Sequence, residues 1–346
     1  MKALYLEDIG KLRIRDISMP VYPKGGALLR VKSVAICGTD LKIFKYGHKR
    51  VKLPWILGHE IAGIIEDVSD NTYYKIGDRV VLNPTVYCGK CYYCKRGMYN
   101  ICLNPDSYGY ERPGGFVEYI GIDVDMVRRG ELYHIPEGLD FDEASLAEPF
   151  ACVINGHKDI HIEPDTYVLI IGAGPIGIMH AIYSRLRGAK SIFIYDINRE
   201  RVNMASSFSE IIDKVFPPEE NLFYDDLKKY TYCRGPDVVI VAAPSQKAQN
   251  VALEVVRKRG EVLFFAGLPM GENLISIDTN LIHYKELKVF GSSNSTGLEM
   301  EKALSLISSS KDLFSRLITD RFPLIEGEKA FSSAFLPSSY KIIINP

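Results

Sequence analysis

The chain has 346 residues, which is long enough for two domains of ordinary size. Apolar residues make up 47% of it and charged residues 25%, a balance typical of folded globular proteins and not of disordered or fibrous ones. The formal net charge of −1 argues against nucleic acid or an anionic membrane surface as a partner. Residues 1–10 lack the apolar core of a signal peptide, and no run of about 18 apolar residues occurs, so we expect a cytoplasmic protein.

The first 151 residues are expected to form a β-rich domain. Short β-like runs, separated by Gly and Pro, occur at residues 27–36, 59–68, 78–84 and 114–120. Before residue 151 these runs do not alternate regularly with predicted helices. This favours a compact domain built mainly of strands.

The pattern changes from Tyr167 to strands alternating with helices. Strands are expected at 167–174, 191–196, 236–243, 260–267 and 286–292, and helices at 175–189 and 246–260. This alternation predicts a parallel, doubly wound sheet over residues 152–292. A helix at 298–310 and a final strand at 341–346 follow. Because a lone strand has no pairing partner of its own, residues 293–346 are expected to complete the first domain.

Four of the seven cysteines, Cys88, Cys91, Cys94 and Cys102, crowd into one short segment. In a reducing compartment such crowding favours metal thiolates over disulfides. Four thiolates can surround one Zn²⁺ tetrahedrally and leave no position open for substrate, so this zinc would be structural. Buried free cysteines, a redox CxxC pair and an iron–sulfur cluster are the alternatives.

A glycine-rich turn, GAGPIG, follows an apolar strand and opens a predicted helix. Glycines there allow a tight turn and a close backbone approach, and the helix N-terminus offers free N–H groups to a pyrophosphate. The alternative is an ordinary βα turn without a ligand. The residues expected to bind the cofactor through this turn are Gly172, Gly174, Pro175, Ile176 and Gly177.

Asp196 stands at the end of the next predicted strand, 19 residues after Gly177. A carboxylate at this position accepts hydrogen bonds from the adenine ribose and repels a 2′-phosphate, which favours NAD over NADP. Arg201, slightly further on, could cover the adenine or be a solvated helix residue.

A third group of residues is dispersed: Cys37, His59, Glu60 and Glu148. None of them is informative alone, because buried cysteines, hydrogen-bonded histidines and structural glutamates are commoner than metal ligands. Asp40 is expected to cap a helix that begins at Leu41.

The chain resembles the zinc-dependent medium-chain dehydrogenase/reductase family, and its polyol (sorbitol-type) branch in particular. The resemblance rests on motifs in a family-specific order: CGTD (37–40), GHE (58–60), GDRV (77–80), the cysteine cluster, GGFVEY (114–119), EP (148–149), GAGPIG (172–177) and the strand-end Asp196. It implies a GroES-like catalytic domain and a Rossmann domain, with two zinc ions per chain and NAD as the cofactor.

The resemblance also implies roles for single residues. Cys37 and His59 would bind the catalytic zinc, with Glu60 and Glu148 competing for the remaining protein position; Cys152 is a rival for it. Thr39 would relay the alcohol proton, with an onward path through His48 less favoured than one through water. Backbone contacts to the nicotinamide half are expected from Gly267, Leu268, Ser292 and Asn294.

The activity implied is reversible hydride transfer from a secondary alcohol to NAD⁺, the substrate being a polyol, sugar alcohol or sugar acid. The basic run Lys42, Lys45, His48, Lys49, Arg50 and Lys52 could hold a phosphate or carboxylate on the substrate, although such a run is usually a solvated loop.

Several rival functions share part of this pattern. Oxidation of L-threonine is the alternative inside the family, weakened because threonine dehydrogenases typically carry His where this chain has Lys42 and Tyr87. A zinc-free quinone reductase, a regulator without catalysis and a zinc-ribbon protein that binds nucleic acid are further rivals. The intact zinc motifs argue against the first two, and the near-zero net charge argues against the last. A homodimer or homotetramer is expected.

Overall fold

The computed structural model describes residues 1–70, 73–216, 218–269 and 271–346. The chain divides into two compact units: unit 1 is Met1–Ala151 together with Asn294–Pro346, and unit 2 is Cys152–Ser293. The first boundary falls within helix α4 (Ala147–Gly156). Among the helices of the described ranges, none combines the length and the apolar character needed to cross a bilayer.

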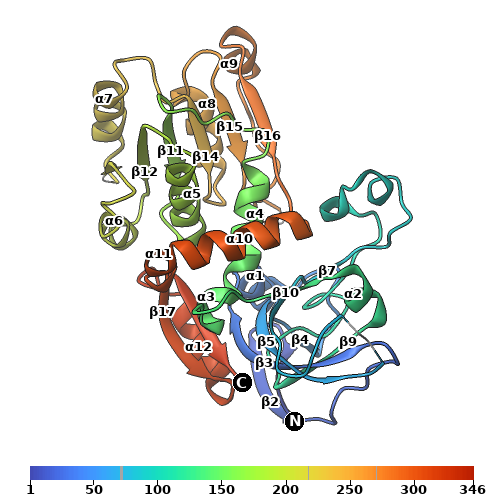
Figure 1. The fold of residues 1–346 in the computed structure, drawn as a ribbon. Helices are drawn as coiled ribbons and strands as arrows, with labels where there is room; N and C mark the ends of the chain where they lie inside the picture. Colours follow the sequence, from blue (N-terminus) through green and yellow to red (C-terminus); the bar gives the residue numbers. More distant parts are fainter. Residues whose placement is uncertain (71–72, 217, 270) are drawn as a thin grey trace. The chain divides into compact units, whose positions relative to one another are not determined.

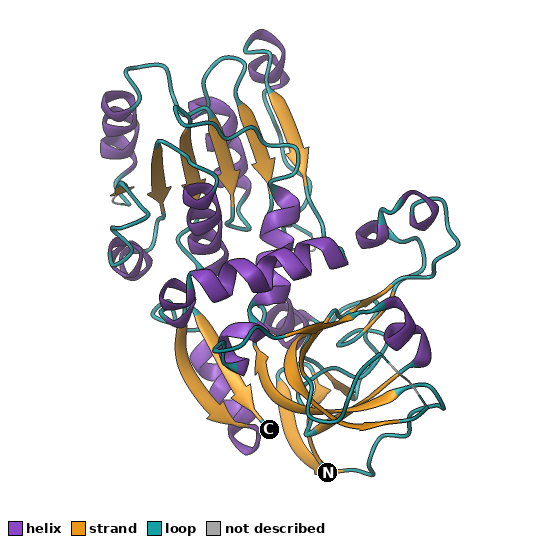
Figure 2. Ribbon diagram, viewed as in Figure 1, coloured by secondary structure: helices purple, strands orange, loops and turns teal. Residues whose placement is uncertain are grey.

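Unit 1 is built mainly of β-strands, drawn in orange in Figure 2. Its main sheet has the strand order β10-β6-β5-β3-β18-β17, and β9 also pairs with β3. Their bounds are β3 Ala27–Ala35, β5 Glu60–Val68, β6 Arg79–Leu82, β9 Tyr119–Ile122, β10 Leu132–His134, β17 Ile318–Pro323 and β18 Lys341–Asn345. In β3, buried Ala27, Leu29 and Val31 alternate with half-buried residues, because successive side chains point to opposite faces of a sheet.

Smaller elements complete unit 1. A second sheet has the order β2-β1-β4, and β7 pairs with β8. The strand bounds are β1 Lys2–Asp8, β2 Lys11–Asp16, β4 Trp55–Ile56, β7 Thr85–Val86 and β8 Asp106–Ser107. The helices are α1 Gly38–Tyr46, α2 Val124–Arg129, α3 Phe141–Ser145, α10 Gly297–Ser309, α11 Lys311–Ser315 and α12 Gly327–Ala334, with 3₁₀ turns η1 Cys94–Arg96, η2 Tyr99–Ile101 and η3 Leu324–Glu326.

The final strand folds back onto unit 1, as expected for a strand without a local partner. β18 lies parallel to β17 and antiparallel to β3, with Ile343 opposite Ala35 and Ile344 opposite Val34. The C-terminal strand therefore fills an interior position in the main sheet, between β3 and β17.

The strand predicted at 114–120 is largely wrong. The backbone N–H groups of Gly114, Gly115 and Phe116 bond to the carbonyls of residues 56–58, at and just after the end of β4, and form no regular strand ladder. The regular strand, β9, begins only at Tyr119. Residues 114–116 thus form a loop, and Val117 makes only an isolated antiparallel bridge to Ala3 of β1.

Unit 2 contains a parallel sheet with the strand order β13-β12-β11-β14-β15-β16 (Figure 1). The strand bounds are β11 Tyr167–Ile171, β12 Ser191–Tyr195, β13 Lys214–Phe216, β14 Val238–Val241, β15 Glu261–Phe264 and β16 Lys288–Gly291. The helices are α5 Pro175–Leu186, α6 Arg199–Ser206, α7 Glu220–Tyr230, α8 Gln246–Val255 and α9 Thr279–Tyr284.

The central strand β11 is buried along its whole length, which is why its sequence is a continuous apolar run and not an alternating one. Helix α5 packs on β11 and β12, and α8 packs on β14 and β15. The predicted α/β fold class, a β-rich domain with a doubly wound parallel sheet, is confirmed. In such sheets ligands bind at the carboxyl ends of the strands, where the glycine-rich turn follows β11.

Candidate metal and cofactor sites

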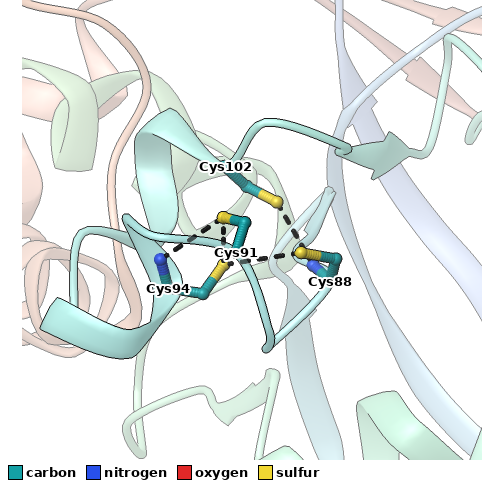
Figure 3. Close-up of side chains that lie close together, drawn as sticks. All are labelled: Cys88, Cys91, Cys94 and Cys102. Carbon is teal, nitrogen blue, oxygen red and sulfur yellow. Dashed lines mark hydrogen bonds between the residues drawn. The ribbon is translucent and has the colours of Figure 1, made fainter.

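The four cysteines of the lobe between β7 and β8 converge in space (Figure 3). The Sγ atoms of Cys91 and Cys94 are 3.4 Å apart, and those of Cys88 and Cys94 are 4.0 Å apart. Tetrahedral Zn–S bonds of about 2.3 Å place sulfur atoms about 3.8 Å from one another. All four thiols are free of disulfides, so the donor set fits one structural zinc ion.

Backbone N–H groups also point at these sulfur atoms. Cys102 Sγ accepts from the N–H groups of Cys88 and Asn104, and Cys91 Sγ accepts from that of Cys94. Backbone hydrogen bonds from Cys94 and Leu103 lower the pKa of the Cys91 thiol to about 6. The loop therefore stabilises the thiolate of Cys91, the protonation state in which cysteine binds a metal, whereas burial raises the pKa of Cys94 to about 12.

A second donor group consists of Cys37, His59 and Glu60, whose ligand atoms all lie within 4.8 Å of one another. Cys37 is the residue before α1, and Glu60 begins β5, where it lies opposite Ala35 of β3. The pairing of β3 with β5 thus brings together residues that are more than 20 positions apart in the sequence.

Asp40 caps a helix, as predicted, and it also organises this donor group. Helix α1 begins at Gly38, not at Leu41, and Asp40 is its third residue in a capping box with Cys37. The fully buried Asp40 carboxylate accepts hydrogen bonds from Cys37 N (2.9 Å) and Gly58 N (3.1 Å), and its Oδ1 lies 3.5 Å from His59 Nδ1. A carboxylate at Nδ1 leaves Nε2 of the imidazole for a metal ion.

Glu60 faces a buried cation. Its Oε2 lies 2.5 Å from Lys341 Nζ, and Lys341 also donates to the carbonyl of Ile36 at 2.9 Å. Neither carboxylate oxygen of Glu60 has a hydrogen bond of good geometry in the described part of the chain. A buried carboxylate held only by an ion pair can also serve as a metal ligand.

The electrostatics of the group favour a positive charge. Burial lowers the pKa of His59, but the charges of Asp40 and Cys37 outweigh it and hold that pKa well above its usual value. The donor set, its carboxylate and its negative charge therefore fit a zinc ion with a mixed Cys/His/Glu shell.

The other residues predicted for this site lie as follows. Thr39 is in the first turn of α1. Glu148 is in the first turn of α4; it is outside the three-residue donor group, although its charge raises the pKa of Tyr110 beside that group. Cys152 is half-buried on α4 and does not belong to the donor group.

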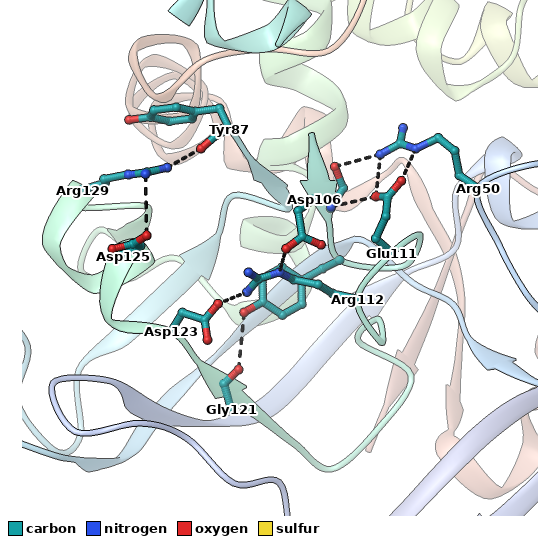
Figure 4. A network of polar contacts seen from close by, with 11 residues as sticks. Arg50, Tyr87, Asp106, Glu111, Arg112, Gly121, Asp123, Asp125 and Arg129 are labelled. Atoms are coloured by element: carbon teal, nitrogen blue, oxygen red, sulfur yellow. Dashed lines mark hydrogen bonds and ion pairs between the residues drawn. The ribbon is translucent and has the colours of Figure 1, made fainter. Parts of the chain in front are cut away.

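Sequence reasoning missed Tyr110, whose ring centroid lies 5.9 Å from that of His59 and 5.5 Å from that of His48. The basic run beside it is mostly solvated. His48 and Arg50 are half-buried, and Arg50 forms a double ion pair with Glu111 (Figure 4). Figure 4 also shows Arg112 bridging Asp106 of β8 and Asp123, the residue before α2.

The glycine-rich turn of unit 2 joins β11 to α5. A Cβ atom on Gly177 would lie 1.9 Å from the carbonyl oxygen of Gly172, so this position requires glycine for close packing. A Cβ atom on Gly174 would meet nothing within 4 Å. Gly174 precedes Pro175, the first residue of α5, so open space lies directly before the N-terminus of the helix. This arrangement suits a phosphate group.

Asp196 follows β12, and its carboxylate accepts from Ala173 N (2.7 Å) and Asn198 N (2.8 Å). It lines a largely apolar pocket together with Gly172, Tyr195, Ile197, Phe223 and Lys247, among others.

Arg201 lies half-buried in the first turn of α6. Gly267 and Leu268 follow β15, and Ser292 follows β16, where Asn155 Nδ2 donates to its hydroxyl. Asn294 belongs to unit 1 and donates to the carbonyl of Asn100.

Comparison with known proteins agrees with this geometry. Residues 23–132 match the alcohol dehydrogenase GroES-like domain, and residues 175–309 match the zinc-binding dehydrogenase domain. A sorbitol dehydrogenase from Bacillus subtilis is 30% identical, covering 100% of this chain and 97% of the relative. A D-altritol 5-dehydrogenase from Agrobacterium fabrum is 31% identical, covering 94% of each chain. A solved zinc-binding dehydrogenase from Sinorhizobium meliloti, bound to NADP, is 26% identical with a TM-score of 0.90, covering 100% of this chain and 99% of that chain.

A β-rich unit with two groups of metal donors and a parallel-sheet unit with a dinucleotide turn define a zinc-type alcohol dehydrogenase. Such an enzyme uses a nicotinamide cofactor. The chain belongs to the zinc-dependent medium-chain dehydrogenase/reductase family, in its polyol branch.

Proposed function

We propose that this protein oxidises a secondary hydroxyl group of a polyol, sugar alcohol or sugar acid and reduces NAD⁺, and that it catalyses the reverse reaction as well. The observation that carries the proposal is the donor group of Cys37, His59 and Glu60 with Asp40 behind it. A zinc ion held there would act as a Lewis acid on the substrate hydroxyl, and a bound nicotinamide would accept the hydride.

The residues of the chain have separate tasks in this proposal. Asp40 orients both Cys37 and His59 through its two carboxylate oxygens. The Thr39 hydroxyl, in the first turn of α1, would carry the proton away from the alcohol. Lys341 compensates the charge of Glu60, so Glu60 can either remain paired with it or serve as a ligand. Glu148 is kept as the other carboxylate candidate.

We assign the cysteine lobe a second, structural zinc ion. Its four thiolates would complete a tetrahedral shell and close it to substrate, so its task is to hold the loop between β7 and β8.

NAD is proposed as the preferred cofactor, although the relative from Sinorhizobium meliloti binds NADP. The support is Asp196, whose carboxylate is held at the end of β12 by two backbone N–H groups. A negative charge at this point accepts the ribose hydroxyls and repels a 2′-phosphate.

A homo-oligomer is proposed as the working form. Strand β16 is the edge of the unit 2 sheet, and apolar Val289 on it is 37% exposed. Edge strands with unpaired backbone groups pair readily with an equivalent strand, so a second copy is the occupant we propose. Light scattering on the purified protein would report a monomer if this is wrong.

The function is tested by a substrate screen with either NAD⁺ or NADP⁺, following the reduced cofactor at its 340 nm absorbance. Sugar alcohols, sugar acids, sugar-alcohol phosphates and L-threonine form the panel. Activity with one of the first three classes is expected. Activity confined to L-threonine, or none with any alcohol, would contradict the proposal.

A further inference from the structure

Tyr110 lies in the loop between β8 and β9, and the packing of this loop brings it to the candidate metal site. The preceding residue, Gly109, has a φ of +82°, and a Cβ atom there would lie 3.1 Å from the carbonyl oxygen of Gly58 and 3.5 Å from the Cβ of His59. The loop therefore rests directly on the backbone that carries His59. The next residue, Tyr110, has its ring centroid 5.9 Å from the imidazole of His59.

The ring of Tyr110 is clamped in place. The Arg50 guanidinium lies over it, 4.5 Å from the centroid, and His48 meets it edge-on. Arg50 is itself fixed by two hydrogen bonds to Glu111, at 2.5 and 2.7 Å, and by a third to Ser107 Oγ (Figure 4). A cation over an aromatic face is attractive, and a guanidinium with three fixed contacts has little freedom to move. The ring consequently has a defined position beside the donor group.

The hydroxyl of Tyr110 is available for a ligand. This hydroxyl belongs to a ring that lies beside His59 of the donor group. Among the described residues, Tyr110 has ring contacts and a backbone hydrogen bond but no hydrogen bond at its hydroxyl, so this O–H can be donated to a bound molecule.

The surroundings of Tyr110 suit a neutral ligand. Two residues of the basic run, His48 and Arg50, contact its ring, and Glu111 compensates the charge of Arg50. A phosphate or carboxylate would have to compete with Glu111 for the guanidinium, whereas an uncharged hydroxyl would not.

We propose that Tyr110 is a specificity-determining residue that donates a hydrogen bond to a second hydroxyl of a neutral polyol, on a carbon close to the one that is oxidised. The inference rests on the proposed function, because it assumes that the oxidised hydroxyl binds at the Cys37–His59–Glu60 group. It predicts that the enzyme prefers polyols to monohydric secondary alcohols, and that this preference depends on the hydroxyl oxygen of Tyr110.

The test compares Tyr110→Phe with Tyr108→Phe as the matched control. Both substitutions remove one hydroxyl from the same loop, but Tyr108 is buried and its hydroxyl faces the carbonyl of Gly121. The steady-state constants are measured for the best sugar alcohol of the screen and for 2-butanol. The affinity of the same sugar alcohol for the enzyme–NADH complex is measured by calorimetry, which requires no turnover.

In Tyr110→Phe we expect KM for the sugar alcohol to rise about tenfold, the loss typical of one missing hydrogen bond in a site built for it. The calorimetric affinity should fall by the same factor. The constants for 2-butanol should stay within about twofold, and Tyr108→Phe should change neither ratio. Equal losses for both alcohols, or no loss, would refute the role of Tyr110, as would a wild-type preference for the phosphorylated polyol. A wild-type enzyme that oxidises no alcohol would instead refute the proposed function itself.

Discussion

Two buried histidines, His157 and His180, should make unit 2 lose stability as the pH falls below neutrality. His180 lies on α5 and is fully buried, His157 is 1% exposed, and the two rings are joined by a 2.9 Å hydrogen bond between His157 Nε2 and His180 Nδ1. Their outer ring nitrogens have no hydrogen-bond partner among the described residues. Burial lowers the pKa of His180 from 6.5 to about 3, and it lowers that of His157 as well.

The sign and size of the effect follow from proton linkage. Below pH 6.5 the unfolded chain binds a proton at His180 that the folded chain does not bind until about pH 3, so unfolding is favoured over this window. At pH 5 the contribution is about 2 kcal/mol, since each pH unit below the unfolded pKa is worth about 1.4 kcal/mol. Because pH 5 lies far above the pKa of about 3 that His180 has in the folded protein, this free energy hardly depends on the exact value of that pKa.

The assay is thermal unfolding at pH 7 and at pH 5 by scanning calorimetry, comparing the wild type with His180→Leu. A loss of about 2 kcal/mol corresponds to roughly 4–8 °C for a unit of this size. Between pH 7 and pH 5, the Tm of His180→Leu should therefore fall less than the Tm of the wild type, by roughly 4–8 °C. Acid also weakens metal binding by thiolates and imidazoles, so the difference between proteins is the informative quantity.

The matched control is His283→Leu, which removes an exposed imidazole from α9 of the same unit. It should leave the pH dependence of Tm unchanged. If His180→Leu shows the same acid loss as the wild type, or if the control reproduces its effect, then the neutral buried imidazole is not the cause and the reasoning is wrong.

Three further perturbations follow from the two sites. Cys37→Ser should lower the zinc content from two ions to one per chain by elemental analysis, because the cysteine lobe keeps its own ion; loss of neither ion would contradict the assignment. Asp196→Ala should reduce the ratio of NAD⁺ to NADP⁺ efficiency at least tenfold by removing the charge that repels a 2′-phosphate, and an unchanged ratio would mean that the ribose lies elsewhere. Gly174→Ala should weaken NADH binding, measured by fluorescence, without changing Tm, whereas Gly177→Ala should lower Tm because its Cβ would lie 1.9 Å from a carbonyl oxygen. Equal Tm values for these two glycine variants would contradict the packing argument.

The sequence by itself determined the features that depend on short-range spacing. The cysteine lobe spans a single loop, so the spacing of its residues already implies a four-sulfur group, and the structure brings the four sulfur atoms together. The glycine-rich turn with its flanking strand and helix was equally visible, and the α/β fold class was correct. These features can be predicted from the sequence because the residues of each one lie in a single turn or loop, so no long-range contact is needed to bring them together.

Tertiary structure decided the surroundings of the dispersed donor group. Asp40 looked like a helix cap in the sequence, and only the pairing of β3 with β5 puts its carboxylate beside His59. Lys341 reaches Glu60 across almost the whole chain, and it bonds to a carbonyl 305 positions away. Tyr110 carried no motif at all, because its position depends on how one loop rests on another. Such contacts depend on long-range packing, and the local spacing of residues does not predict which residues distant in the sequence come into contact.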